Sequence, residues 1–166
     1  IKATIINGAT DMNPGQYGTG SGREMNARPN NVEGWGRVNV MNSIFPTAPR
    51  VLRYDNYTTG LSTGNYRYYQ FTVNSSAESL RATLVWTDYP SSPSASRNLV
   101  NDLDILLQNT SATIYYPNGL SSADTTNNVE GIDISSPATG TYCLAISGRS
   151  VPNGPQPYAL VVSGNI

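Results

Sequence analysis

The residues best suited to chemistry lie in one short stretch, residues 99–107, where acidic and amide side chains alternate with apolar ones. In a strand of period two, Asp102 and Asp104 fall on one face, and Leu103 and Ile105 fall on the other. Neighbouring carboxylates repel each other unless something positive lies between them. Calcium prefers clustered carboxylate and carbonyl oxygens as ligands. The stretch therefore predicts a calcium site on a strand.

Loops at the same end of the fold are expected to supply further oxygen donors to this site. With no histidine and a single cysteine in the chain, the donors are all oxygens, which favours calcium over zinc or copper. Three alternatives stay open: a solvated edge strand with surface aspartates, pairing of the aspartates with Arg97 or Arg81, and capping by backbone amides. The candidate calcium ligands are Asp88, Asn101, Asp102, Asp104, Asn128 and Glu130.

The absence of histidine also limits catalysis. A Ser-His-Asp or Cys-His arrangement cannot be completed within this chain, so no catalytic residue is assigned. Cys143 is the only cysteine, which excludes an internal disulfide. Because it lies in an alternating apolar segment between Tyr142 and Leu144, we expect a packed, unreactive thiol.

The composition of the chain limits the kinds of partner that it is expected to bind. Charged residues make up 13% of the 166 residues and the net charge is −1, so no surface for tracking phosphates is expected and nucleic acid is not a predicted partner. No apolar stretch approaches the roughly 20 residues that span a bilayer, so a membrane is not a predicted partner either. Asn, Ser, Thr and Tyr supply most of the polarity, which is typical of secreted proteins.

The first 45 residues differ from the rest of the chain. Residues 1–6 have the apolar spacing of a helix that ends at Asn7-Gly8. Residues 11–31 form a long loop rich in Gly, Asn and Pro. Around Trp35 we expect a tight turn that leads into a short helix ending before Pro46.

After this segment the pattern is that of short strands separated by loops rich in Gly, Pro, Asn and Ser. Alternating apolar positions predict a mainly β fold, an antiparallel jelly-roll β-sandwich of seven or eight strands. The expected strands are residues 51–57, 66–73, 81–88, 101–108, 112–116, 129–134, 140–147 and 156–163.

Several motifs resemble a known family. Residues 2–9 and the motif Glu33-Gly-Trp-Gly-Arg37 resemble the closing part of the catalytic domain of a subtilisin-like serine peptidase. Thr83-Leu-Val-Trp-Thr-Asp88 and Leu99-Val-Asn-Asp-Leu-Asp104 resemble the jelly-roll domain that follows it in secreted alkaline subtilases, a domain related in architecture to the P domain of kexin-type peptidases. The similarity covers nearly the whole chain.

The resemblance implies that residues 1–45 are the end of the catalytic domain and that residues 46–166 are an accessory domain. The expected function is the C-terminal part of a secreted serine endopeptidase, which stabilises its own catalytic domain and guides protein substrates without being catalytic alone. Ser21 is not expected to be the nucleophile, because its glycine loop follows a helix whereas the family's nucleophile precedes one. We also expect Trp35 to rest against the missing catalytic domain, and structural calcium agrees with the resemblance.

A function of another class is also considered, a free-standing carbohydrate-binding module. β-Sandwiches can bind sugars through exposed aromatic side chains, and the chain has eleven tyrosines. Three sequons for N-glycosylation begin at Asn56, Asn74 and Asn109, and they matter only in a eukaryotic secreted protein.

Overall fold

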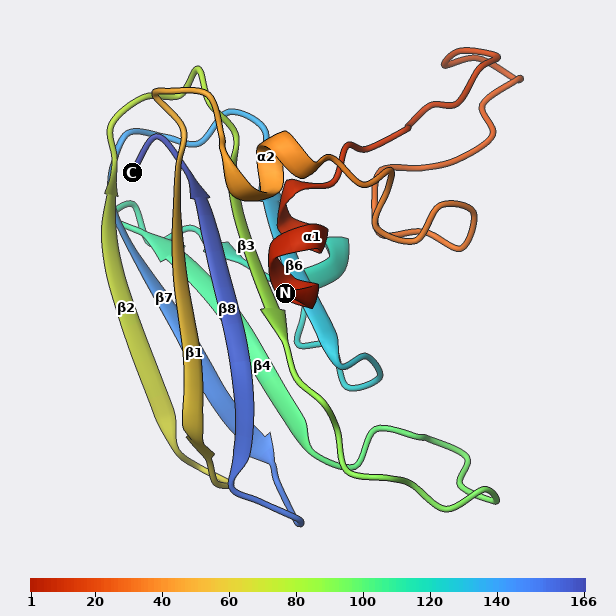
Figure 1. The fold of residues 1–166 in the computed structure, drawn as a ribbon, viewed down its shortest axis with the longest axis vertical. Coiled ribbons are helices and arrows are strands. Elements are labelled where there is room, and N and C mark those ends of the chain that lie inside the picture. Colours follow the sequence, from red (N-terminus) through yellow and green to blue (C-terminus); the bar gives the residue numbers. More distant parts are fainter.

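The computed structural model describes residues 1–166 and contains two antiparallel β-sheets of four strands each. The strands are β1 (Val51–Leu61), β2 (Tyr66–Val73), β3 (Leu80–Val85), β4 (Asp102–Asn109), β5 (Ile114–Tyr115), β6 (Val129–Ile134), β7 (Gly140–Ser150) and β8 (Gln156–Gly164). The first sheet has the order β1-β8-β3-β6 and the second the order β2-β7-β4-β5 (Figure 1). Two facing four-stranded sheets in this order form a jelly roll, so the predicted fold is confirmed.

The core lies between the two sheets and follows the predicted alternation. Leu103, Ile105 and Leu107 of β4 point inward and are at most 1% exposed. Trp86 follows the end of β3, lies in the same core, and donates a hydrogen bond of 2.8 Å from Nε1 to the main-chain oxygen of Asn101. Burial of the indole ring together with its polar nitrogen thus joins the two ends of the loop between β3 and β4.

All eight predicted strands are present, with differences at their ends. β1 continues to Leu61 because the chain bulges between Tyr57 and Leu61, with Gly60 at a φ of +78°. β3 ends at Val85 rather than Asp88, because the chain then turns into the long loop that leads to β4.

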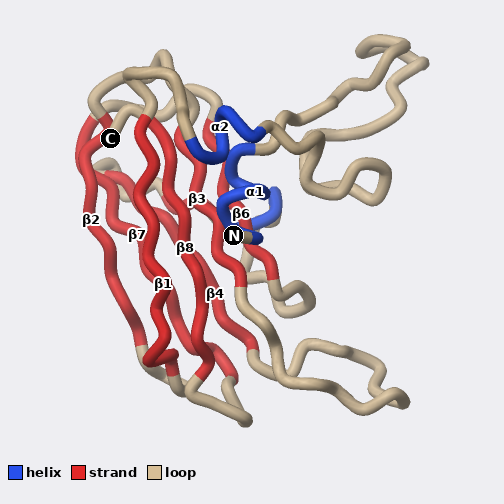
Figure 2. The backbone as a smooth tube through the Cα atoms, viewed as in Figure 1, coloured by secondary structure: helices blue, strands red, loops and turns tan.

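Two short helices cover the outer face of the first sheet, α1 (Lys2–Gly8) and α2 (Val40–Ile44), close to the predicted ranges. Figure 2 shows both helices on one side of the strands, connected by a long loop. Ala3 and Ile6 of α1 pack with Val85, Val129 and Val161 in a second, smaller apolar cluster. The strands β3 and β8 are therefore buried on both faces, which a two-layer sandwich alone would not give.

Trp35 contacts a strand of this chain. Its ring lies against Gly131 of β6, where a Cβ atom would come within 2.5 Å of the ring, so only glycine leaves enough room. Trp35 also packs against the small apolar cluster under α1. Within this chain the partly buried indole ring covers the edge strand of the sandwich, and its contact with a catalytic domain stays a prediction.

The outer face of the second sheet is not covered by the helices, because α1 packs on β3 and β8 of the first sheet and α2 packs on α1. Neither helix combines the length and the apolar character that crossing a bilayer requires.

Candidate functional site

The predicted acidic strand lies at one edge of the second sheet. Asp102 is buried and Asp104 is partly buried, so the alternative of a solvated edge strand with surface aspartates is wrong. Arg149 of β7 is the cation between them: its Nε lies 3.9 Å from Asp102 Oδ2 and its Nη1 lies 3.6 Å from Asp104 Oδ2. An arginine therefore pairs with both aspartates, as one alternative expected, but the arginine is Arg149.

Arg97 and Arg81, which the sequence offered for this pairing, lie elsewhere. Arg97 donates to the main-chain oxygen of Thr125, and Arg81 lies 3.7 Å from Asp133.

Glu130 of β6 reaches across from the first sheet to the same strand. Its Oε2 accepts a hydrogen bond of 2.7 Å from the main-chain N–H of Ile105. β5 pairs only with Leu107 and Gln108 of β4, so this N–H on the outer edge has no strand partner. The carboxylate thus takes the place of a missing strand and connects the two sheets.

Burial makes these carboxyl groups weaker acids than they are in water. It raises the pKa of Asp102 to about 6, with a further contribution from the charge of Asp104, while Arg149 opposes the change. Burial likewise raises the pKa of Asp104, again against the effect of Arg149. For Glu130, burial raises the pKa to about 10, although the hydrogen bond from Ile105 favours the ionised form.

One oxygen of each acid in this acidic cluster is buried without a hydrogen-bond partner: Asp102 Oδ1, Asp104 Oδ1 and Glu130 Oε1. Unsatisfied buried polar atoms are rare and require an explanation, such as a bound ion. No three acidic or thiol side chains of the chain converge closely enough to hold a metal ion by themselves. The cluster could therefore hold a cation only with additional main-chain or water oxygens.

The other predicted ligands are engaged in the loops around the cluster. Asp88 accepts hydrogen bonds from the N–H groups of Val100 and Asn101, at 2.7 Å each. The amide of Asn101 donates to Asn153 O, and that of Asn128 donates to Trp86 O. These three side chains bond to the backbone and hold the loops in place.

Asp124 is a buried acid near this site that the sequence reasoning missed. Its carboxylate accepts hydrogen bonds from the side-chain amides of Asn118 at 2.6 Å and Asn127 at 2.7 Å, and from the N–H of Thr126 at 2.8 Å. Burial raises the pKa of Asp124, but these hydrogen bonds outweigh burial and lower it overall. The Asp-Thr-Thr-Asn sequence, typical of a turn capped by aspartate, is the signal that could have identified it.

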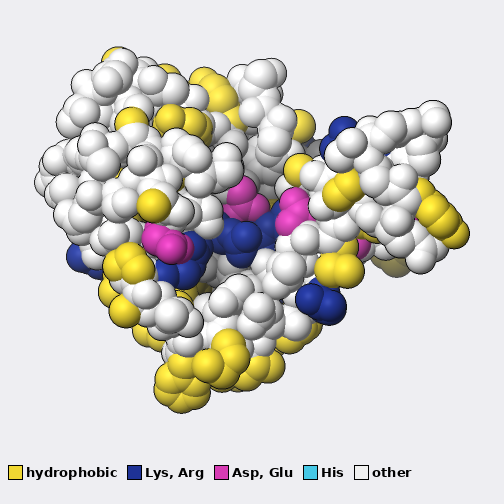
Figure 3. Space-filling model, turned by 90° about the horizontal axis from the view of Figure 1, so that it is seen from above, with side chains coloured by type: hydrophobic (Ala, Val, Ile, Leu, Met, Phe, Trp, Pro, Cys, Tyr) yellow, Lys and Arg dark blue, Asp and Glu magenta, His cyan; other side chains and the backbone are white.

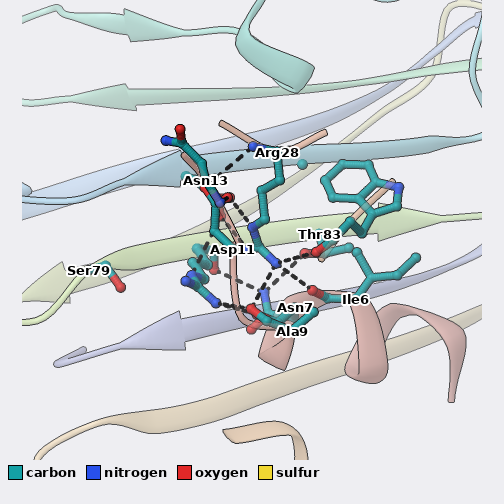
Figure 4. Close-up of polar contacts among 12 residues, drawn as sticks. Ile6, Asn7, Ala9, Asp11, Asn13, Arg28, Ser79 and Thr83 are labelled. Atoms are coloured by element: carbon teal, nitrogen blue, oxygen red, sulfur yellow. Dashed lines mark hydrogen bonds and ion pairs between the residues drawn. The ribbon is translucent and has the colours of Figure 1, made fainter. Parts of the chain in front are cut away.

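A second polar site joins the N-terminal segment to the sandwich (Figure 4). Arg28 is buried, and its Nη1 donates to the main-chain oxygens of Ile6, Ala9 and Trp35 at 2.9 to 3.2 Å. Its Nε and Nη2 form a two-pronged ion pair with Asp133 of β6, at 2.7 and 3.0 Å. One side chain thus satisfies carbonyls at the C-terminal end of α1 and anchors them to the sheet.

Arg81 and Asn7 complete this arginine cluster. Arg81 of β3 donates to the main-chain oxygens of Asn7 and Ala9, at 3.1 and 2.9 Å. Burial, and then the charge of Arg28, lowers the pKa of Arg81 to about 10. The amide of Asn7 in turn donates to Thr83 Oγ1 at 3.1 Å. Sequence pattern gives no signal for this cluster, because its contacts between the N-terminal segment and the strands join residues more than 70 positions apart.

A cleft of about 750 Å³ opens beside the arginine cluster, between the N-terminal segment and the sandwich. Figure 3 shows basic and acidic side chains next to each other in this hollow. The lining includes Arg28 and Arg81 together with Asp11 and Asp133. Arg28 and Arg81 pair with Asp133, and Asp11 accepts hydrogen bonds from the N–H groups of Asn13 and Arg28, so each of these charged groups already has a partner.

No catalytic nucleophile is assembled. Ser21 is exposed in the N-terminal loop, and the chain has no histidine to activate it. Cys143 is exposed, so the expected packed thiol is wrong. Tyr142 and Leu144 point into the core, and strand alternation therefore turns Cys143 outward.

Two of the three sequon asparagines are accessible. Asn56 and Asn74 are exposed, whereas Asn109 is partly buried. The Oδ1 atom of Asn109 accepts hydrogen bonds from Ser111 and Thr113, which holds the turn before β5.

Comparison with known proteins relates the chain to proteins whose names include serine protease. It is 32% identical to the serine protease/ABC transporter B family protein tagB of Dictyostelium discoideum and 30% identical to tagD of the same organism, over 99% of this chain in each case. It is 33% identical to tagA over 61% of the chain. The chain spans about a tenth of the length of tagB and tagD, 11% and 12% respectively.

No protein-family model matches the chain. A solved structure from Sulfurospirillum deleyianum is 10% identical, with 70% of this chain and 97% of that chain covered at a TM-score of 0.39.

Proposed function

We propose that this chain is the C-terminal accessory part of a secreted subtilisin-like serine endopeptidase, which stabilises the catalytic domain, guides protein substrates, and is not catalytic alone. The chain is homologous to a region of proteins named as serine proteases, which supports a protease-associated role. It has no histidine, and its exposed Ser21 has no activating partner, so catalysis must lie elsewhere in the longer protein.

The observation that carries this proposal is an exposed apolar surface on the N-terminal segment. Ten of the seventeen exposed large apolar side chains lie within residues 1–45, on the side of the molecule that carries the helices. Five of them form what we term the α2 patch: Val38, Val40, Met41, Ile44 and Phe45, which are 51 to 67% exposed. Exposed apolar side chains concentrated in one short segment are typical of an interface with another domain.

The proposal is tested by combining the chain with the separately produced catalytic domain of the longer protein. We expect the chain to prolong the half-life of protease activity on heating, and the double variant Met41→Asp/Phe45→Asp to lose this effect. The matched control is Tyr54→Asp, which places a charge on an exposed side chain of β1, outside the α2 patch. Equal protection by the wild type and the α2-patch variant would show that another surface makes the contact.

The chain alone is expected to hydrolyse neither casein nor a chromogenic peptide. Activity in a pure preparation that a serine-protease inhibitor abolishes would contradict the assignment of an accessory part.

We also propose that Asp102 and Asp104 hold a structural calcium ion with their free Oδ1 atoms. The three unpartnered oxygens of the acidic cluster support this, because hard cations take carboxylate oxygens and several ligands are often carbonyls or waters. Calcium would supply positive charge beyond that of Arg149. Glu130 lies in the same cluster and could contribute its free oxygen.

Calcium that binds only the folded state raises the free energy of unfolding by about 2.7 kcal/mol at a hundredfold excess over Kd. We therefore expect the melting temperature to rise with calcium, to fall with chelator, and to be insensitive to calcium in Asp102→Asn. Glu78→Gln is the control, since Glu78 pairs with Arg50 in a different part of the molecule. Identical melting of metal-free protein with and without calcium would favour neutralisation by Arg149 alone.

A further inference from the structure

The outward face of the second sheet carries an ordered arrangement of side chains of which the proposed function uses only Asp104. Antiparallel pairing places outward residues of β2, β7 and β4 in three rows, each with one residue from each strand. The rows are Tyr66, Ser147 and Asp104; Tyr68, Ala145 and Leu106; and Gln70, Cys143 and Gln108.

These rows form a groove along β7 with a volume of about 390 Å³. Its floor consists of the small side chains of the central strand, Cys143, Ala145 and Ser147. Tyr66 and Tyr68 on β2 form one wall, and Leu106 and Tyr116 contribute to the other. The three rows span four residue intervals, or about 14 Å along the strand, which is longer than a single sugar ring.

One wall of the groove is an aromatic platform. Tyr66 and Tyr68 are 60% and 66% exposed, their ring planes lie within 8° of parallel, and their centroids are 6.2 Å apart. Exposed tyrosines offer a flat apolar surface together with a hydroxyl group that can remain hydrated. A ligand with one apolar face and polar edges matches this surface.

The groove is lined by one acidic side chain and no cation. Asp104 is the only charged residue among those that line it, and Arg149 lies 3.6 Å from its carboxylate. Nucleic acid would need cations along its path, and a cationic peptide would need free carboxylates. The lining therefore complements an uncharged ligand.

The backbone excludes an extended peptide as the best fit. The main chain of β7 is already paired with β2 on one side and β4 on the other. A peptide that lies on this face cannot form strand pairs, so its N–H and C=O groups would be buried without partners. A pyranose ring has no repeated N–H and C=O groups that need hydrogen-bond partners, because its polar groups are hydroxyls at the ring edge.

We propose that this groove binds a neutral polysaccharide chain. Sugar rings stack on Tyr66 and Tyr68, and sugar hydroxyls hydrogen-bond to Gln108 and Ser147, whose side chains both donate and accept. The groove and the α2 patch are different surfaces, because α2 packs on α1, which covers the first sheet, whereas the groove lies on the second sheet.

Sedimentation with insoluble cellulose, chitin and starch tests the proposal. We expect the chain to be retained on at least one of the three, and Tyr66→Ala/Tyr68→Ala to bind it at least tenfold more weakly. Ala145→Arg, which fills the floor of the groove, should also abolish retention. The control is Tyr54→Ala, which removes a tyrosine of similar exposure, 62%, from the other sheet.

Each variant is first checked for an unchanged melting temperature, as expected for exposed side chains. Retention that survives both the double tyrosine variant and Ala145→Arg would overturn the proposal, and so would failure of the wild type to bind any of the three polysaccharides. Light scattering identifies the other possible occupant: a dimer that the double tyrosine variant dissociates would show that a second copy of the chain covers the groove.

Discussion

At the scale of single residues, Arg28 bonds through every nitrogen of its guanidinium group. It contacts three main-chain oxygens of the N-terminal segment and both carboxylate oxygens of Asp133. The side chain of Arg28 is 2% exposed and that of Asp133 is 33% exposed. Removal of the Arg28 side chain would leave the main-chain oxygen of Trp35 without a donor and would take one donor each from the oxygens of Ile6 and Ala9, which is costly inside a protein.

We expect Arg28→Met to lower the free energy of unfolding by about 3 kcal/mol, because it breaks a partly buried ion pair and several hydrogen bonds together. Urea denaturation measures the change. The control is Arg23→Met, since Arg23 is exposed, and there we expect a change within about 0.5 kcal/mol. Equal effects of the two substitutions would mean that the cluster contributes little to stability.

Asp124 gives a prediction about pH. Its pKa is lowered in the folded state, so below its unfolded value of about 4 the unfolded chain binds more protons than the folded one. Its contribution to stability is therefore present above that pH and is lost as the pH falls through the folded pKa. We expect the stability difference between wild type and Asp124→Asn to be largest at neutral pH and to shrink in acid.

Denaturation in urea at a series of pH values from 7 down to the acid transition measures this difference. Asn127→Ala removes one of the amide donors, so it should weaken the same dependence without changing the carboxylate. Parallel stability profiles for wild type and Asp124→Asn would contradict the prediction.

At the scale of elements, the edge strand β6 supports three different contacts. Asp133 binds Arg28, Gly131 contacts the ring of Trp35, and Glu130 accepts a hydrogen bond from the unpaired edge of β4. The outward positions of β6, Gly131 and Asp133, thus contact the N-terminal segment, and the inward position Glu130 contacts the second sheet. This short strand couples all three layers of the molecule.

We expect Gly131→Ala to displace the ring of Trp35 and to cost about 1–3 kcal/mol, as is typical of overpacking. Tryptophan fluorescence should shift as the indole becomes more exposed, and thermal melting gives the loss of stability. Gly20→Ala is the matched control, because nothing lies within 4 Å of the Cβ position there. A fluorescence spectrum unchanged in Gly131→Ala would show that the ring is not held against β6.

At the scale of the whole molecule, α1 and the sandwich form one packed unit. Ala3 and Ile6 are buried against the first sheet, and the side chain of Asn7 is fully buried among β3 and β8. Between the two helices, residues 16–24 are largely exposed, in a loop that projects from the body (Figure 1). The two parts of the N-terminal segment therefore differ in their contacts.

Hydrogen exchange should reveal this difference. We expect amides of α1 that are bonded within the helix to exchange about as slowly as those of β3, and amides of residues 16–24 to exchange much faster. In Arg28→Met, protection of α1 should fall while protection of β4 and β7 is retained. Fast exchange throughout residues 1–45 in the wild type would show that α1 is not locked onto the sheet.

The sequence by itself determined the jelly roll and the extent of nearly every strand. Leu103, Ile105 and Leu107 alternate with polar residues, and a half-buried strand imposes this period of two locally. The sequence also identified Asp102 and Asp104 as an acidic pair and Glu130 as a residue near them. These features are local or come from recurring motifs, so they are readable without coordinates.

Only the tertiary structure decided which groups meet. Arg149 rather than Arg97 or Arg81 lies between the aspartates, Trp35 covers Gly131, and Arg28 binds a carboxylate 105 residues away. Such contacts depend on strand register and on which sheet face the N-terminal segment covers, and neither is encoded in the spacing of neighbouring residues. The groove of Tyr66 and Tyr68 also exists only because pairing aligns three distant strands across one face.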